Sequence, residues 1–199
     1  MQITGICRDR VTPKELEDHQ YQFSYTWPEC IGDDLACEIK QMLKSSVFDD
    51  SLLGFNRYSS DNDYNQFIDN LKSGLATGSC LYLNIRSGES LVGMSILIPN
   101  KSPNCRHIID ITKGYIVSKF RGRRVVKGAF KAMIKKCASR DFHLFTLDVR
   151  EKSRAHLLWQ SFGFEEYGRL EKYALIDGEF HSGVFMQQTI QSLRDTLGE

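Results

Sequence analysis

The chain has 199 residues, of which 41% are hydrophobic and 26% are charged, as in an ordinary globular protein with one sizeable domain. Its net charge of +1 excludes binding to nucleic acid or to an anionic membrane through overall charge, so any cationic site has to be local. Six cysteines without Cys-x-x-Cys spacing, and five histidines that do not cluster with them, argue against a metal site.

No apolar stretch reaches the ~20 residues that a membrane-spanning helix needs, and residues 1–8 contain no apolar signal core. We therefore expect no membrane partner and a cytoplasmic location with reduced thiols.

Hydrophobic periodicity divides the chain into helices, where apolar residues recur every three or four positions, and strands, where they alternate. In chain order the pattern predicts helix 33–46, helix 61–75, a strand hairpin over 81–98, strand 106–117, a helix to about residue 139, strand 145–149, helix 153–162 and a second hairpin over 164–189. The strand-helix-strand order in the middle favours a parallel pair. We therefore predict an α/β fold with a single mixed, mostly antiparallel sheet and helices on both faces.

The most informative segment is the basic turn between strand 106–117 and the helix after it. Five cations fall within residues 119–127, together with Gly122. Backbone N–H groups at a helix start lack helical partners, and the helix dipole adds partial positive charge there. Such a turn is suited to phosphate. A solvated helix start with surface cations is the alternative interpretation.

Two motifs resemble those of the GNAT superfamily of acyl-CoA-dependent N-acyltransferases. Residues 121–126 are similar to its Arg/Gln-x-x-Gly-x-Gly/Ala turn. Residues 152–164 are similar to its Asn-x-x-Ala-x-x-Leu-Tyr-x-x-x-Gly-Phe segment. The resemblance is clearest over 75–187 and implies a single GNAT-like domain over 1–199.

The resemblance also implies a function. It implies acetyl-CoA as cofactor, bound around the parallel strand pair, with CoA as product. The acetyl group would pass directly to a primary amine of a small molecule or peptide, on a monomer or homodimer. The implied cofactor-binding residues are Ile116, Val117, Arg121, Gly122, Arg123, Arg124, Val125, Val126, Lys127, Lys152, Ala155 and Trp159. Backbone N–H groups of Ile116 and Val117 would bind the thioester oxygen.

Four of these positions depart from the family pattern. Arg124 and Val126 stand where glycines are expected, and their Cβ atoms would crowd the phosphates, although Arg124 can supply charge-assisted hydrogen bonds. Trp159 replaces a tyrosine and has no acidic hydroxyl, and Lys152 replaces an asparagine. An inactive acyl-CoA-binding sensor or scaffold is therefore the alternative to an enzyme. Nucleic-acid binding through residues 119–136 is the weakest interpretation.

Asp110 is the residue that the resemblance implies as general base. It lies six positions before the predicted oxygen-binding residue, where some family members carry a carboxylate. Its apolar neighbours Ile109 and Ile111 suggest burial, which would raise its pKa. A structural carboxylate is the alternative. Candidates for protonating the leaving thiolate are Tyr115, Tyr167 and Tyr173. Strand packing is the simpler role for each of them, and the thiolate can also leave without a general acid.

Acceptor specificity is expected from residues 45–60 and from the Asp177-Gly178 turn, which flank the acceptor side in the family. Four acids make this region negative: Asp49, Asp50, Asp61 and Asp63. They would suit a cationic amine such as a polyamine, an aminoglycoside or a lysine. Solvated acids, one of them capping a helix, are the simpler alternative.

Overall fold

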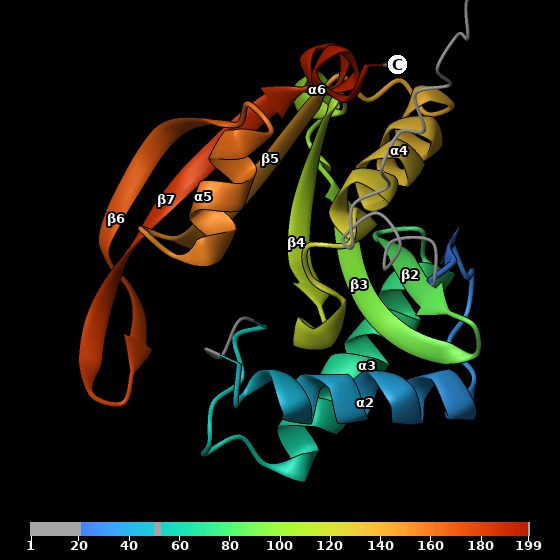
Figure 1. The fold of residues 1–199 in the computed structure, drawn as a ribbon, viewed down its shortest axis with the longest axis vertical. Coiled ribbons are helices and arrows are strands. Elements are labelled where there is room, and N and C mark those ends of the chain that lie inside the picture. The colour runs from blue at the N-terminus through green and yellow to red at the C-terminus, as the bar shows by residue number, and fades with distance from the viewer. Residues whose placement is uncertain (1–20, 50–52, 199) are drawn as a thin grey trace, which may run out of the picture.

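The computed structural model describes residues 21–49 and 53–198, and this part of the chain forms the predicted single mixed sheet (Figure 1). The sheet order is β1-β2-β3-β4-β5-β7-β6. The strands are β1 (Phe23–Thr26), β2 (Leu81–Ser87), β3 (Ser90–Pro99), β4 (Ile108–Ile116), β5 (Leu144–Arg150), β6 (Glu165–Ile176) and β7 (Glu179–Thr189). The helices are α2 (Asp33–Ser46), α3 (Asp61–Ala76), α4 (Val125–Ala138), α5 (Arg154–Ser161) and α6 (Ile190–Leu197). Among the strands of the described residues, only β4 and β5 pair in parallel, as predicted.

Helices cover both faces of the sheet, and each layer encloses its own apolar core. On one face α2 and α3 pack against the strands, with Ile39 and Ile68 in a core that includes Tyr82. On the other face α4 and α6 enclose a second core around Phe130. Tyr82 and Leu83 are neighbours on β2 that point to opposite faces, and both are fully buried.

The pairing of β4 with β5 is short. It covers Ile108–Asp110 against Leu144–Thr146. Beyond it, β4 bulges: its register with β3 shifts between Met94 and Ile96, and Lys113 takes a φ of 52°. A bulge adds a residue and bends its strand. In Figure 1 the two strands run apart from their paired ends.

Two elements at the ends of the described chain are not predicted from the sequence, β1 and α6. The strand β1 is only four residues long, and it is held from far along the chain, because the Tyr25 hydroxyl donates to the carbonyl of Val125 at 3.0 Å. Helix α6 buries Ile190, Leu193 and Leu197, which do have helical spacing. It follows β7 without a break, so the change of period is easily missed.

Candidate functional site

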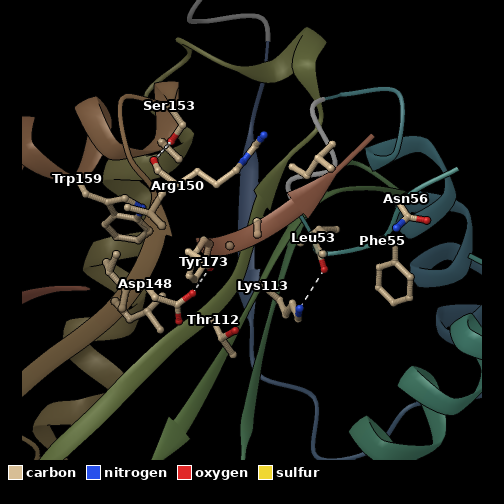
Figure 2. A pocket seen from close by; sticks show the side chains of 18 of the residues that line it. Leu53, Phe55, Asn56, Thr112, Lys113, Asp148, Arg150, Ser153, Trp159 and Tyr173 are labelled. Carbon is tan, nitrogen blue, oxygen red and sulfur yellow. Dashed lines mark hydrogen bonds between the residues drawn. The ribbon is translucent and has the colours of Figure 1, made fainter. Parts of the chain in front are cut away.

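A cleft of about 460 Å³ opens where β4 and β5 part (Figure 2). Its walls come from these two strands, from the loop after α2, from α5 and from the end of β6. The polar residues that line it are Asn56, Thr112, Lys113, Asp148, Arg150, Ser153 and Tyr173. Segments far apart in the sequence therefore bring titratable and hydrogen-bonding groups into one space.

Asp148 on β5 is the acidic group of the cleft. Within residues 21–49 and 53–198 it is the only carboxylate in the cleft wall. The hydroxyl of Tyr173, which reaches over from β6, donates a hydrogen bond to its Oδ2 (Figure 2). Burial, and then the hydrogen bond to Asp148 and its charge, raise the pKa of Tyr173. The pair therefore holds a carboxylate and a neutral hydroxyl together at the cleft surface.

A glycine on β7 sets the position of Tyr173. A Cβ added at Gly183 would lie 2.2 Å from Cγ of Tyr173, so the ring rests on the strand where a side chain is missing. Real Cβ atoms do not approach so closely, and any larger residue would push the ring away. Gly183 therefore supports the contact between Tyr173 and Asp148 from outside the cleft.

Asp110, the base that the resemblance implies, lies behind the cleft wall at the closed end of the strand pair. It stands opposite Thr146 in the parallel register, and the Thr146 hydroxyl donates to it at 2.8 Å. Burial, and to a lesser extent the charge of Asp148, raise the pKa of Asp110, and the Thr146 bond partly opposes this. Asp110 is half-buried, and it is Asp148 rather than Asp110 that is among the residues lining the cleft.

From the raised pKa of Asp110 we predict how the free energy of unfolding depends on this residue and on pH. Its folded pKa lies above the unfolded value, so the ionised form destabilises the fold at neutral pH. We expect Asp110→Asn to increase the free energy of unfolding near pH ~7, and this gain to vanish below pH ~4, where both states hold the proton. Urea unfolding at both pH values tests this, with Asp69→Asn on the exposed side of α3 as control. A gain that is equal at both pH values would contradict the assignment.

The three tyrosine candidates lie in different surroundings. Tyr173 lines the cleft, whereas Tyr115 is buried on the α2–α3 side and donates to Asp49 at 3.0 Å. Burial, and then Asp49, raise the pKa of Tyr115 to about 12. Tyr167 is exposed on β6 and is not part of the cleft wall. Of the three, only Tyr173 is placed to meet a molecule in the cleft.

The backbone N–H groups of Ile116 and Val117, the two predicted donors to the thioester oxygen, point to opposite edges of β4. The N–H of Val117 donates to the carbonyl of Val92 on β3 at 2.9 Å. Successive N–H groups along an extended strand alternate in direction, so the Ile116 N–H points toward β5, which has parted from β4 at this level. Ile116 is therefore the available donor at the open edge.

In the basic turn, Arg124 takes the left-handed backbone conformation that usually favours glycine. Gly122 has a φ of 75° and Arg124, the N-cap of α4, has a φ of 57°. The Arg124 side chain does not cap the helix. The first turn of α4 thus presents backbone N–H groups beside exposed cations such as Lys127.

Arg121 is used differently from its neighbours, because its side chain is bound within the protein. It makes a two-pronged contact with Asp49, whose Oδ1 accepts from Nη1 at 3.0 Å. Its Nε also donates to the Ile116 carbonyl at 2.9 Å. Burial alone would raise the pKa of Asp49, but the hydrogen bonds from Arg121 and Tyr115 lower it overall. Arg121 therefore ties the basic turn to the segment after α2.

The second motif, residues 152–164, forms α5 and the turns on either side of it. Ala155 and Trp159 line the cleft, and the Trp159 ring packs against Phe130 and Phe164 at centroid distances of 5.4 and 5.0 Å. Lys152 is exposed, with a φ of 58°. Trp159 thus serves as a packed wall of the cleft, the role that its indole chemistry allows.

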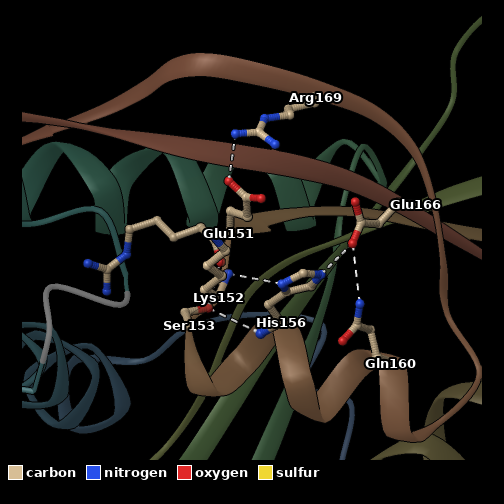
Figure 3. Close-up of polar contacts among 8 residues, drawn as sticks. Glu151, Lys152, Ser153, His156, Gln160, Glu166 and Arg169 are labelled. Carbon is tan, nitrogen blue, oxygen red and sulfur yellow. Dashed lines mark hydrogen bonds and ion pairs between the residues drawn. The ribbon is translucent and has the colours of Figure 1, made fainter.

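His156 holds the turn before α5, a role that the sequence did not reveal (Figure 3). Its ring is buried, its Nδ1 accepts from the Lys152 N–H at 3.0 Å, and its Nε2 lies 2.8 Å from Glu166 on β6. Because Nδ1 accepts, Nε2 carries the proton and donates to Glu166. His156 therefore fixes Lys152 and joins α5 to the β6–β7 hairpin.

The acidic residues expected at the acceptor side have internal partners where the structure describes them. Asp49 binds Arg121, Asp61 forms ion pairs with Lys40 and Lys44, and Asp63 completes a capping box with Ser60. Asp50 lies outside the described residues. Of the described residues, it is Asp148 that brings negative charge to the cleft wall.

The Acetyltransferase (GNAT) family model matches residues 40–164, and the chain belongs to this family. None of the curated proteins matches the chain.

Solved structures share the fold at low sequence identity. A ribosomal-protein-alanine N-acetyltransferase from Brucella melitensis has a TM-score of 0.67 and 19% identity, covering 84% of this chain and 99% of its own. An acetyltransferase of the GNAT family from Streptococcus pneumoniae has a TM-score of 0.67 and 15% identity, covering 84% and 99%. The yncA protein from Salmonella typhimurium, solved with its cofactor acetyl-CoA, has a TM-score of 0.67 and 12% identity, covering 84% and 94%. These likenesses confirm the fold.

The family uses acetyl-CoA, and this chain offers groups that fit it. The uncapped start of α4 and the cations beside it suit a diphosphate, and the Ile116 N–H faces the parted strand edge. None of the helices in residues 21–49 and 53–198 combines the length and the hydrophobicity that a membrane span requires. Nor do the same residues include a group of three or more His, Cys, Asp or Glu side chains that could hold a metal ion.

Proposed function

We propose that this protein transfers an acetyl group from acetyl-CoA directly to a primary amine of a small molecule or peptide. The observation that carries the proposal is the cleft between β4 and β5, with Asp148 and Tyr173 at its surface. A carboxylate and a hydroxyl at an open strand edge are the groups that an incoming amine needs, since the amine has to lose a proton before it reacts.

On the donor side, we assign the cofactor to the basic turn and the end of β4. Backbone N–H groups from Gly122 to Lys127 would hold the diphosphate, and the Ile116 N–H would bind the thioester oxygen. Lys152, Ala155 and Trp159 would form the opposite wall. Bound acetyl-CoA supplies the activated acetyl thioester, and every other group in this proposal belongs to the chain.

On the acceptor side, we assign removal of the amine's proton to two carboxylates. Asp148 meets the amine, and Asp110 lies behind it with a raised pKa. Tyr173 steadies the Asp148 carboxylate through its hydrogen bond, and it can return a proton to the leaving thiolate.

A negative group at the cleft surface favours a cationic amine. The amine acceptor of the Brucella melitensis neighbour, a ribosomal-protein alanine, supports an amine here. Free thiols at the five described cysteines support the cytoplasm as location.

A second candidate function is an acyl-CoA-binding sensor or scaffold with little or no turnover. One observation favours it: Trp159 occupies the tyrosine position of the family motif and is packed among Phe130 and Phe164. No hydroxyl is therefore available from α5 at that point.

Turnover against a panel of amines separates the two functions. Polyamines, an aminoglycoside and peptides with a free N-terminus or lysine would be incubated with acetyl-CoA while CoA release is followed. We expect amine-dependent release, with the acetyl group found on nitrogen by mass spectrometry. Tight binding of acetyl-CoA without release for any amine would favour the sensor.

A further inference from the structure

Lys113 is an amine that the fold itself places in the cleft. It lies in the bulge of β4, with a φ of 52°, and it lines the cleft between Thr112 and the loop after α2. Its Nζ donates to the carbonyl of Leu53 at 2.9 Å (Figure 2). A Cβ added at Gly54 would lie 3.1 Å from the same Nζ, so the loop closes tightly over it.

The surroundings of Lys113 differ from those of a surface lysine. Across the described residues, no carboxylate lies within 4.0 Å of its Nζ, and its hydrogen-bond partner is a neutral carbonyl. Burial lowers the pKa of Lys113, and the more distant Asp148 only partly opposes this. A larger share of this lysine is therefore the neutral amine, which is the nucleophilic form.

We propose that Lys113 is a self-acetylation site, at which the protein uses its own cleft amine as an acceptor. This proposal rests on the proposed function, since the same cleft has to bring the acetyl thioester to the amine. The ammonium form first gives up a proton to Asp148 or water. The neutral Nζ then attacks the acetyl carbonyl carbon, the N–C bond forms and the C–S bond breaks. The sulfur keeps the electron pair and takes up the proton that Nζ loses, so the products are N-acetyl-lysine and CoA.

The modification would regulate the enzyme, because an amide does not pass its acetyl group on. The acetylated Nζ keeps one N–H for the Leu53 carbonyl but loses its charge, and the added group takes up space in the cleft that Lys113 lines. Without an amine acceptor, acetyl-CoA would therefore slowly close the acceptor side of the cleft. A bound acceptor would compete with Lys113 and keep the cleft open.

The experiment follows acetylation site by site on the full chain. Protein is incubated with acetyl-CoA alone, and peptide mass spectrometry measures the rate at Lys113 against the exposed Lys101 and Lys172. We expect Lys113 to react on the order of tenfold faster, and excess free CoA to slow Lys113 only. Acetyl phosphate, which carries no CoA, should give no preference for Lys113. Lys113→Arg should abolish the fast phase, and the surface change Lys101→Arg should leave it intact.

Two results would overturn the proposal, and they are distinguishable. If acetyl-CoA raises the unfolding temperature but Lys113 reacts no faster than Lys101, self-acetylation is wrong and the proposed function stands. If acetyl-CoA does not bind, both fall together.

Discussion

Replacing Asp148 by asparagine is expected to lower kcat/KM for an amine acceptor by roughly 100- to 10,000-fold, the range found when a general acid or base is removed. Among the described residues it is the only carboxylate in the cleft wall, and asparagine keeps its shape while removing its charge. Tyr173→Phe removes the hydrogen bond to Asp148 and the proton donor proposed for the thiolate, and it should cost at least tenfold in kcat/KM.

Steady-state kinetics across pH measure both variants, with two matched comparisons. Asp141→Asn, an exposed change just before β5, should leave kcat/KM unchanged. Asp110→Asn should lower it less than Asp148→Asn, because Asp110 lies behind the cleft wall. A larger loss for Asp110→Asn would mean that Asp110 is the general base, as the family resemblance implies. Full activity of Asp148→Asn would refute the acceptor-side assignment.

Gly183→Ala is expected to have the largest effect of any change outside the cleft. The new methyl would lie 2.2 Å from Cγ of Tyr173, so the ring has to leave its place on β7. Overpacking of this kind costs about 1–3 kcal/mol in the free energy of unfolding. The displaced hydroxyl also loses Asp148, so kcat/KM should fall at least as far as in Tyr173→Phe.

Gly168→Ala on β6 is the control for this change. Its added Cβ would meet Phe185 at 3.5 Å, an ordinary contact, so stability and activity should be nearly unchanged. The double variant Gly183→Ala with Tyr173→Ala should recover part of the lost stability, because the clashing ring is gone. If Gly183→Ala unfolds and turns over like the parent protein, Tyr173 is not held by β7 as described.

Periodicity predicted most of the fold because each long element carries its own pattern. Helix α2 begins and ends at the predicted residues, and the hairpins and the parallel pair lie where alternation and chain order placed them. The strand β1 escaped prediction because it has only four residues, and it is held by pairing with β2 and by the hydrogen bond from Tyr25 to Val125, a hundred positions later. Hydrophobic periodicity depends on neighbouring residues, so it cannot predict contacts between distant ones.

The basic turn could be located from the sequence, whereas the residues that meet in the cleft could not. A contiguous motif marks the basic turn, and the structure holds Arg124 in the left-handed conformation expected of a glycine. Sequence spacing could not show that Arg121 is bound by Asp49. Nor could it show that Asp148, Tyr173 and Gly183 meet, because three separate strands and an irregular β6–β7 register bring them together.

The central claim is that the altered basic turn still holds acetyl-CoA at the parted strands, and thermal unfolding with and without this ligand tests it most directly. Free CoA and ATP serve as controls. A ligand at about 100 times its dissociation constant stabilises the native state by about 2.7 kcal/mol, a shift of several degrees for a domain of this size. We predict such a rise with acetyl-CoA and CoA but not with ATP. No rise at saturating acetyl-CoA would mean that Arg124 and Val126 close the turn, and it would contradict the account.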